Sequence, residues 1–185
     1  MGAWVVINAG WYQRLMRYSP VMSSGQKIKG LLDQPETNIL IFAFLLNYPW
    51  EFLQAPFFEG MAVATHWDAV KVCTRATLGD AAIMLFAYWS VAVAVSDRWW
   101  FRASSRMQML GFIAVGVIIT VTIEHFATQS MDSAWGWRYS DSMPTVPIVG
   151  VGLTPLLQWI LLPPLAIWFI RRQLKAVTVP ESSET

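Results

Sequence analysis

Three polar side chains, Asn47, Glu51 and Gln54, lie close together in the first long apolar stretch of the chain. Their spacing of four and then three residues places all three on one face of a helix, which Pro49 is expected to kink. A carboxyl group between two amides could serve as a general acid, relay protons, or contact an ion or a ligand. The alternative is a structural hydrogen-bonding hub that holds helices together.

Two later apolar stretches carry acidic residues of their own. Asp80 follows Gly79 near the start of one stretch, where a carboxylate is also an ordinary helix cap. Glu124 and His125 end the next stretch, and neighbours on a helix point about 100° apart, so both cannot face lipid cheaply. If the protein is an enzyme, we expect its catalytic groups to be Glu51, Glu124 and Asp80.

The composition that surrounds these residues is typical of a membrane protein. Of 185 residues, 55% are hydrophobic and 14% are charged, whereas a soluble domain usually has about 25% charged residues. Eleven tryptophans suit two membrane interfaces. The net charge of +1 and the dispersed basic residues argue against a nucleic-acid partner. The single cysteine, Cys73, excludes an internal disulfide and a cysteine-based zinc site, and we interpret it as a small apolar filler.

The apolar stretches predict an all-α, polytopic membrane helix bundle of about four transmembrane helices. They lie at about 38–57, 77–97, 108–128 and 146–170, each near the ~20 residues that a bilayer requires. The last stretch contains four prolines, so it could be one broken helix or a short re-entrant piece followed by a span. Residues 3–18 have a helical period but are too short to span, which favours an interfacial amphipathic helix.

The same patterns predict the organisation and orientation of the chain. Residues 1–36 form the interfacial helix and a linker, 37–172 the transmembrane bundle, and 173–185 a partly disordered tail. Ten of the 13 basic residues fall on the side that holds both termini, and three fall on the other side. Because positive loops stay inside, both termini are expected to be cytoplasmic.

With this topology the three acids fall at a similar depth near the outer side of the membrane. Each costs roughly 2.5–3.5 kcal/mol at the bilayer centre and less near the interface. We therefore expect a polar pocket that opens outward beneath the loops 58–76 and 129–144, although the aromatic rings there also fit an ordinary interfacial belt. The expected ligand-binding residues are Asn47, Trp50, Gln54, His66, His125, Trp135, Trp137, Tyr139 and Gln158.

No metal or cofactor is identified by a motif. A metal site could draw on His66, His125, Glu124 and Asp68, yet the HxxxH, HExxH and CxxC spacings are absent. We therefore expect no metal and leave the cofactor unknown.

A set of short motifs resembles small multi-pass inner-membrane proteins of bacteria that have no assigned function. The resemblance covers roughly residues 40–170 and implies a location in the bacterial inner membrane but no activity. A fainter likeness to membrane-bound carotenoid cyclases and hydratases comes from the Trp-x-Tyr before a proline-bearing span, but their paired-acid motif before the last helix is absent. The motifs are Asn47-Tyr48-Pro49-Trp50-Glu51-x-x-Gln54, Gly79-Asp80, Trp137-x-Tyr139, Met143-Pro144, Gly152-Leu153-x-Pro155-x-x-Gln158 and Pro163-Pro164.

Three kinds of function follow from these observations. The first is a non-catalytic membrane protein whose pocket holds a lipid, a pigment or a partner helix, with membrane lipids or other membrane-protein subunits as partners, as in an accessory subunit. The second is an intramembrane isomerase, cyclase or hydratase, in which Glu51 or Glu124 protonates an isoprenoid or another lipid and tryptophan rings shield the cation. The third is a proton- or ion-coupled carrier, which the absence of inverted repeats disfavours.

Overall fold

The computed structural model describes residues 24–130 and 136–177. The expected interfacial helix at 3–18, and residues 178–185 of the expected tail, lie outside the described residues. The chain divides into two compact units, Met1–Leu31 and Leu32–Thr185. In the first unit the structure describes most of helix α2 (Ser24–Leu32).

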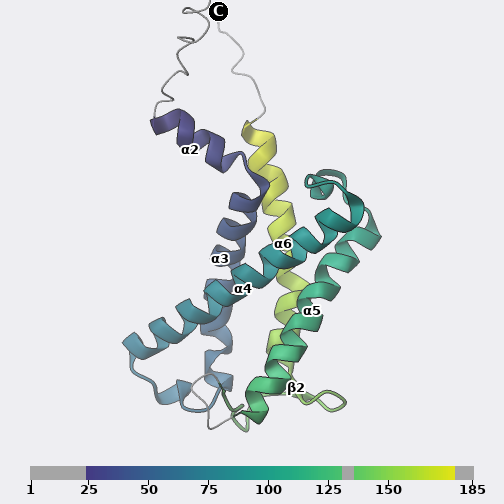
Figure 1. Ribbon diagram of the computed structural model, residues 1–185. Helices are drawn as coiled ribbons and strands as arrows, with labels where there is room; N and C mark the ends of the chain where they lie inside the picture. The colour runs from purple at the N-terminus through teal and green to yellow at the C-terminus, as the bar shows by residue number, and fades with distance from the viewer. Residues whose placement is uncertain (1–23, 131–135, 178–185) are drawn as a thin grey trace, which may run out of the picture. The chain divides into compact units, whose positions relative to one another are not determined.

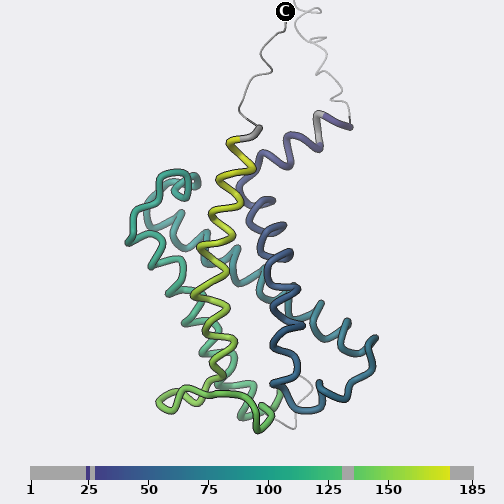
Figure 2. The backbone as a smooth tube through the Cα atoms, turned by 180° about the vertical axis from the view of Figure 1, so that it is seen from behind, coloured from purple at the N-terminus to yellow at the C-terminus, as the bar shows by residue number. Residues whose placement is uncertain are grey.

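The described part of the second unit is built on four long helices. They are α3 (Pro35–Gln54), α4 (His66–Val95), α5 (Arg106–Gln129) and α6 (Leu153–Val177). Helix α3 packs against α4 and α6, and α5 packs against the same two helices, so the four enclose one core (Figure 1). The view from behind shows α3 and α6 side by side along most of their length (Figure 2).

Helices α4, α5 and α6 are long and apolar enough to cross a membrane. Large apolar side chains on their outer faces are exposed, including Leu78, Phe86 and Ile118, as expected where a helix meets lipid. This confirms the predicted helical class, with three helices long and apolar enough to span a membrane. Helix α3 is 20 residues long but is not among the three, because its amides and acids lower its hydropathy. The count of four spans stays a prediction.

The ends of two helices differ from those predicted. Helix α4 begins at His66 rather than near 77, because Thr65 caps it by accepting a hydrogen bond from the Asp68 N–H at 3.2 Å. The stretch expected to be a loop over 58–76 is therefore helical in its second half. Helix α6 begins at Leu153 rather than at 146.

The eight residues before α6 form a small hairpin instead of the start of the helix. Strand β1 (Thr145–Val146) pairs antiparallel with β2 (Val151–Gly152). Gly150 in the intervening turn has a φ of 65°, a conformation that glycine adopts without strain. Helix α6 then runs without a break through Pro163 and Pro164.

Helices α5 and α6 pack tightly against each other at Gly116. A Cβ atom built on Gly116 would lie 2.0 Å from Cε3 of Trp159, so only a glycine leaves room for the buried indole. This contact fixes the position of α6 next to the polar residues described below.

Candidate functional site

Gln158 of α6 lies at the centre of a buried polar network. Its Nε2 donates hydrogen bonds to Asn47 Oδ1 at 2.7 Å and to Asp80 Oδ2 at 2.8 Å. The same nitrogen lies 3.3 Å from Glu51 Oε1. An amide nitrogen has two hydrogens for these three acceptors, so the contact with Glu51 is the weakest. One side chain therefore connects α3, α4 and α6.

The polar face of α3 is closed by hydrogen bonds within that helix. Gln54 Nε2 donates to Glu51 Oε1 at 2.7 Å, and Trp50 Nε1 donates to Gln54 Oε1 at 3.3 Å. Asn47 Nδ2 donates to the Ala43 carbonyl at 2.7 Å. Asn47, Glu51 and Gln54 are 0%, 8% and 5% exposed. The helix face that carries these three residues, as predicted from their spacing, therefore points into the bundle.

The carboxyl groups of Glu51 and Asp80 gather on one amide nitrogen, because Gln158 Nε2 lies 3.3 Å from Glu51 Oε1 and 2.8 Å from Asp80 Oδ2. Two carboxyl groups held this close repel each other when both are ionised, which favours a proton on one of them. A carboxyl pair of this kind, in a largely buried position, is able to hold one proton. It is the group in this network best suited to proton donation.

Glu124 of α5 forms a second polar cluster with the loop that precedes β1. Trp137 Nε1 donates to Glu124 Oε2 at 3.0 Å, and the Tyr139 hydroxyl donates a short hydrogen bond to the same oxygen. The Gly152 N–H donates to the Tyr139 hydroxyl at 3.0 Å. Burial, and then the nearby Glu124 carboxyl, raise the pKa of the Tyr139 phenol, which therefore stays a donor.

Two loops cover this end of the bundle and are joined by backbone hydrogen bonds. The Glu59 N–H donates to the Arg138 carbonyl at 3.0 Å, and the Ser140 N–H donates to the Phe57 carbonyl at 2.9 Å. The first loop contains the short helices η1 (Ala55–Phe57) and η2 (Met61–Val63). The loops thus form one connected cover rather than two separate flaps.

A cavity of about 590 Å³ lies between the two polar clusters. Its wall comes from α4 and α5 where the two helices diverge (Figures 1 and 2), with contributions from α3, α6 and the covering loops. The volume is in the range of small-molecule sites, roughly 300–1,000 Å³. Glu51, Asp80 and Glu124 all line it, together with mainly apolar side chains.

The structure brings most of the predicted site residues to this cavity. Besides the three acids, Gln54, Trp137 and Gln158 line it. Asn47, Trp50 and Tyr139 are each one hydrogen bond away from a lining residue. Trp135 lies outside the described residues.

The two histidines are not part of the site. His66 is exposed at the start of α4, and His125 is exposed and hydrogen-bonds Gln129 at 2.8 Å. Neither lines the cavity. In the part of the chain that the structure describes, no group of three histidine, cysteine or acidic residues could hold a metal ion.

Most of the lining residues were not singled out from the sequence as site residues, and these include Cys73, Arg75, Thr120 and Trp159. Two of these four could have been found from helical spacing. Cys73 shares the face of Asp80 on α4, and Thr120 lies four residues before Glu124 on α5. The Thr120 hydroxyl and the Trp159 indole N–H are buried with no partner among the described residues. Buried polar atoms without a hydrogen-bond partner are rare in folded proteins. Because these two lie in the cavity wall, they favour a ligand site rather than a purely structural role.

Comparison of the chain with protein-family models, curated proteins and solved structures finds no match.

Proposed function

We propose that this chain is an integral membrane protein whose cavity binds one small, largely apolar molecule that carries a hydrogen-bonding group, such as a lipid or a pigment. The observation that carries the proposal is the cavity itself. Its wall is mainly apolar, and the Glu51–Asp80 pair and Gln158 supply polar groups on one side. Sites for small molecules combine an apolar lining with a few placed polar groups in this way.

In this proposal α3 is the fourth membrane span. Its 20 residues reach about 30 Å at ~1.5 Å per residue, which matches the hydrocarbon thickness. Its amides and its acid face α4 and α6 rather than lipid, which removes most of the cost of placing them there. The distribution of basic residues supports an orientation with both termini in the cytoplasm and the cavity toward the outside of a bacterial inner membrane.

The test is native mass spectrometry of protein extracted in a mild detergent. Wild type is expected to carry a copurified small molecule. Ala76→Trp, which fills the cavity from its wall, should lose that mass. The matched control Ala82→Trp adds the same ring to an exposed position on the same helix and should keep it. Wild type without a bound molecule, or Ala76→Trp with one, contradicts the proposal. A stoichiometric protein in the spectrum would identify an accessory subunit instead.

A second function is favoured by the carboxyl pair, namely acid catalysis on an isoprenoid or another lipid. A proton held by Glu51 or Asp80 could be donated to a double bond, and the rings of Trp137 and Trp159 in the cavity wall could stabilise the resulting cation. Glu51→Gln keeps the size and hydrogen-bonding capacity of this side chain but removes its acidity. Loss of lipid turnover with retained lipid binding in this variant would support catalysis. A lipid that is unchanged after incubation with wild type would exclude it.

A further inference from the structure

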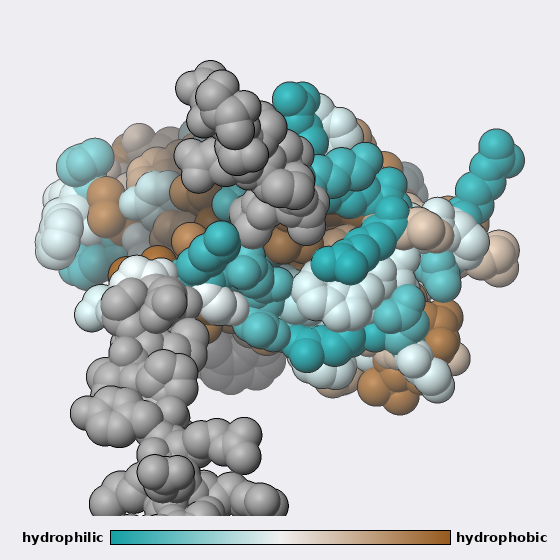
Figure 3. All heavy atoms as spheres, turned by 90° about the horizontal axis from the view of Figure 1, so that it is seen from above, coloured by the Kyte–Doolittle hydropathy of each residue, from teal (hydrophilic) through white to brown (hydrophobic). Residues whose placement is uncertain are grey.

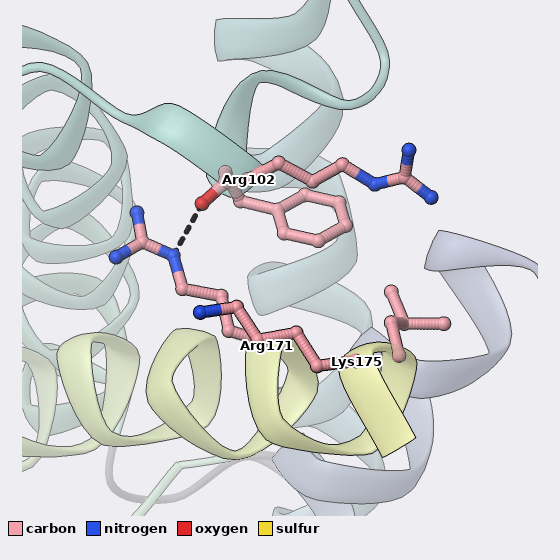
Figure 4. A pocket seen from close by; sticks show the side chains of 5 residues that line it. Arg102, Arg171 and Lys175 are labelled. Atoms are coloured by element: carbon pink, nitrogen blue, oxygen red, sulfur yellow. Dashed lines mark hydrogen bonds between the residues drawn. The ribbon is translucent and has the colours of Figure 1, made fainter. Parts of the chain in front are cut away.

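A second concave site lies at the opposite end of the bundle, between the 3₁₀ helix η3 (Trp100–Ala103) and the last turns of α6. It has a volume of about 210 Å³. Figure 4 shows Arg102, Arg171 and Lys175 around it, and Phe101 and Leu174 complete the lining. Three of these five residues are cationic and none is acidic.

Arg171 builds the site by holding its two walls together. Its Nε donates to the Phe101 carbonyl, as the dashed line in Figure 4 marks, and its Nη2 donates to Ser104 Oγ at 2.7 Å. These bonds use two of the five N–H donors of the guanidinium group. The arginine therefore has a structural role and can also contribute its charge to the pocket.

The surroundings of the pocket are strongly basic. Residues 97–106 and 165–177 contain six arginines and lysines and one acid, Asp97. One of the six, Arg98, forms an ion pair with Glu36 of α3 at 2.6 Å. The Asp97 carboxylate accepts a hydrogen bond from the Trp99 N–H at 2.7 Å. The Arg102 guanidinium stacks on the Trp99 ring, 3.9 Å from its centroid. The view onto this end shows hydrophilic side chains beside apolar ones (Figure 3).

We propose that this pocket binds the phosphate group of an anionic phospholipid from the adjoining leaflet. Guanidinium and ammonium groups are the usual partners of phosphate oxygens, and basic pockets between transmembrane helices suit anionic headgroups. The apolar walls of Phe101 and Leu174 suit the glycerol backbone rather than a fully hydrated soluble ion. Trp168, one turn before the pocket on α6, is 48% exposed, and such rings gather at headgroup level. The acyl chains would stay in the bilayer.

The test is titration with phosphatidylglycerol, followed by native mass spectrometry. The double variant Arg102→Gln/Lys175→Gln removes two charges from the pocket. The matched control Arg106→Gln/Arg172→Gln removes two charges from the same end without altering the lining. Each pocket charge is expected to account for about fivefold in affinity, so the pocket variant should bind on the order of 25-fold more weakly. The control should bind nearly as well as wild type.

The other outcomes count against the proposal. An equal loss in both double variants would show attraction to a basic surface rather than binding in the pocket. Equal binding of phosphatidylcholine, or no binding of phosphatidylglycerol by wild type, would overturn the lipid assignment. If soluble glycerol phosphate binds as tightly as the lipid, the pocket is a site for a soluble anion. Should the double variant fail to fold, the single variant Lys175→Gln replaces it, with about fivefold weaker binding expected and unchanged affinity counting against the pocket. Arg171 is left intact because it holds η3 on α6.

Discussion

At the scale of single residues, this protein places acids in an apolar bundle by giving each one a hydrogen-bond donor. Glu51 and Asp80 share Gln158, and Glu124 accepts from Trp137 and Tyr139. A buried polar group that keeps its partners costs little, whereas one that loses them costs about 1–3 kcal/mol. The hydrogen-bond donors are therefore as important to the site as the acids.

Gln158→Leu tests the donor that serves three helices. Leucine has a similar size but cannot donate to Asn47 or Asp80, so we expect unfolding to become easier by about 1–3 kcal/mol. The measurement is the thermal unfolding midpoint in detergent. Gln173→Leu makes the same change at an exposed position of α6 and should leave the midpoint nearly unchanged. Equal shifts in the two variants would refute the role given to Gln158.

Tyr139→Phe tests the second cluster. The variant keeps the ring contact with Phe58 but removes the hydroxyl that joins Glu124 to the Gly152 N–H. We expect a loss of about 1–3 kcal/mol in stability. Tyr48→Phe is the control, because Tyr48 contacts its neighbours through its ring. A Tyr139→Phe protein as stable as the Tyr48→Phe protein would mean that the hydroxyl bonds are unimportant.

At the scale of elements, the position of α6 against α5 decides where Gln158 points. The contact between Trp159 and Gly116 sets this position, since no side chain fits between the ring and the α5 backbone. The residue next in sequence to Trp159 is the centre of the polar network. Packing between two helices and hydrogen bonding among three helices are thus coupled through adjacent residues.

Gly116→Ala should separate α5 from α6. The added methyl group would overlap the Trp159 ring, and overpacking of this kind costs about 1–3 kcal/mol. Gly111→Ala, on the same helix, is the matched control, because its Cβ would lie 3.8 Å from Val91 Cγ2, an ordinary contact. We expect a lower unfolding midpoint in the first variant only. Tolerance of alanine at Gly116 would show that the two helices adjust freely.

At the scale of the whole molecule, the distribution of charge predicts the orientation in the membrane. The loops that cover the central cavity and the chain segments beyond α6 should lie on opposite sides of the bilayer. This arrangement would place the cavity and the proposed lipid site in different leaflets. The two sites could then be occupied independently.

Cysteine labelling in spheroplasts tests this orientation. In a Cys73→Ala background, which removes the single native cysteine, Glu59→Cys should react with a membrane-impermeant maleimide. Ser182→Cys should react only after the membrane is permeabilised. Labelling of Ser182→Cys in intact spheroplasts, with Glu59→Cys protected, would invert the topology. In permeabilised membranes both variants should be labelled, which checks that each cysteine is able to react.

The sequence by itself determined the features that depend on local pattern. Hydropathy identified the membrane-length helices, and the spacing of Asn47, Glu51 and Gln54 identified a face that the structure buries, because helical periodicity is a property of consecutive residues. The signals at Thr65 for the start of α4 and at Gly150 for a turn before α6 were also present. The charged residues after Thr65 favoured a loop there, and the apolar pattern over 146–170 obscured the turn.

Only the tertiary structure decided which polar groups meet. That Gln158 contacts both Asn47 and Asp80, and that Cys73 and Trp159 line the same cavity as Glu51, depends on the rotation and separation of helices far apart in the sequence. Close packing between helices, as at Gly116, sets this rotation and separation. The residues of one stretch do not show which other stretch it will pack against. The two histidines are a further example. Their residue type suggested a role in the binding site, but both are exposed and neither lines the cavity.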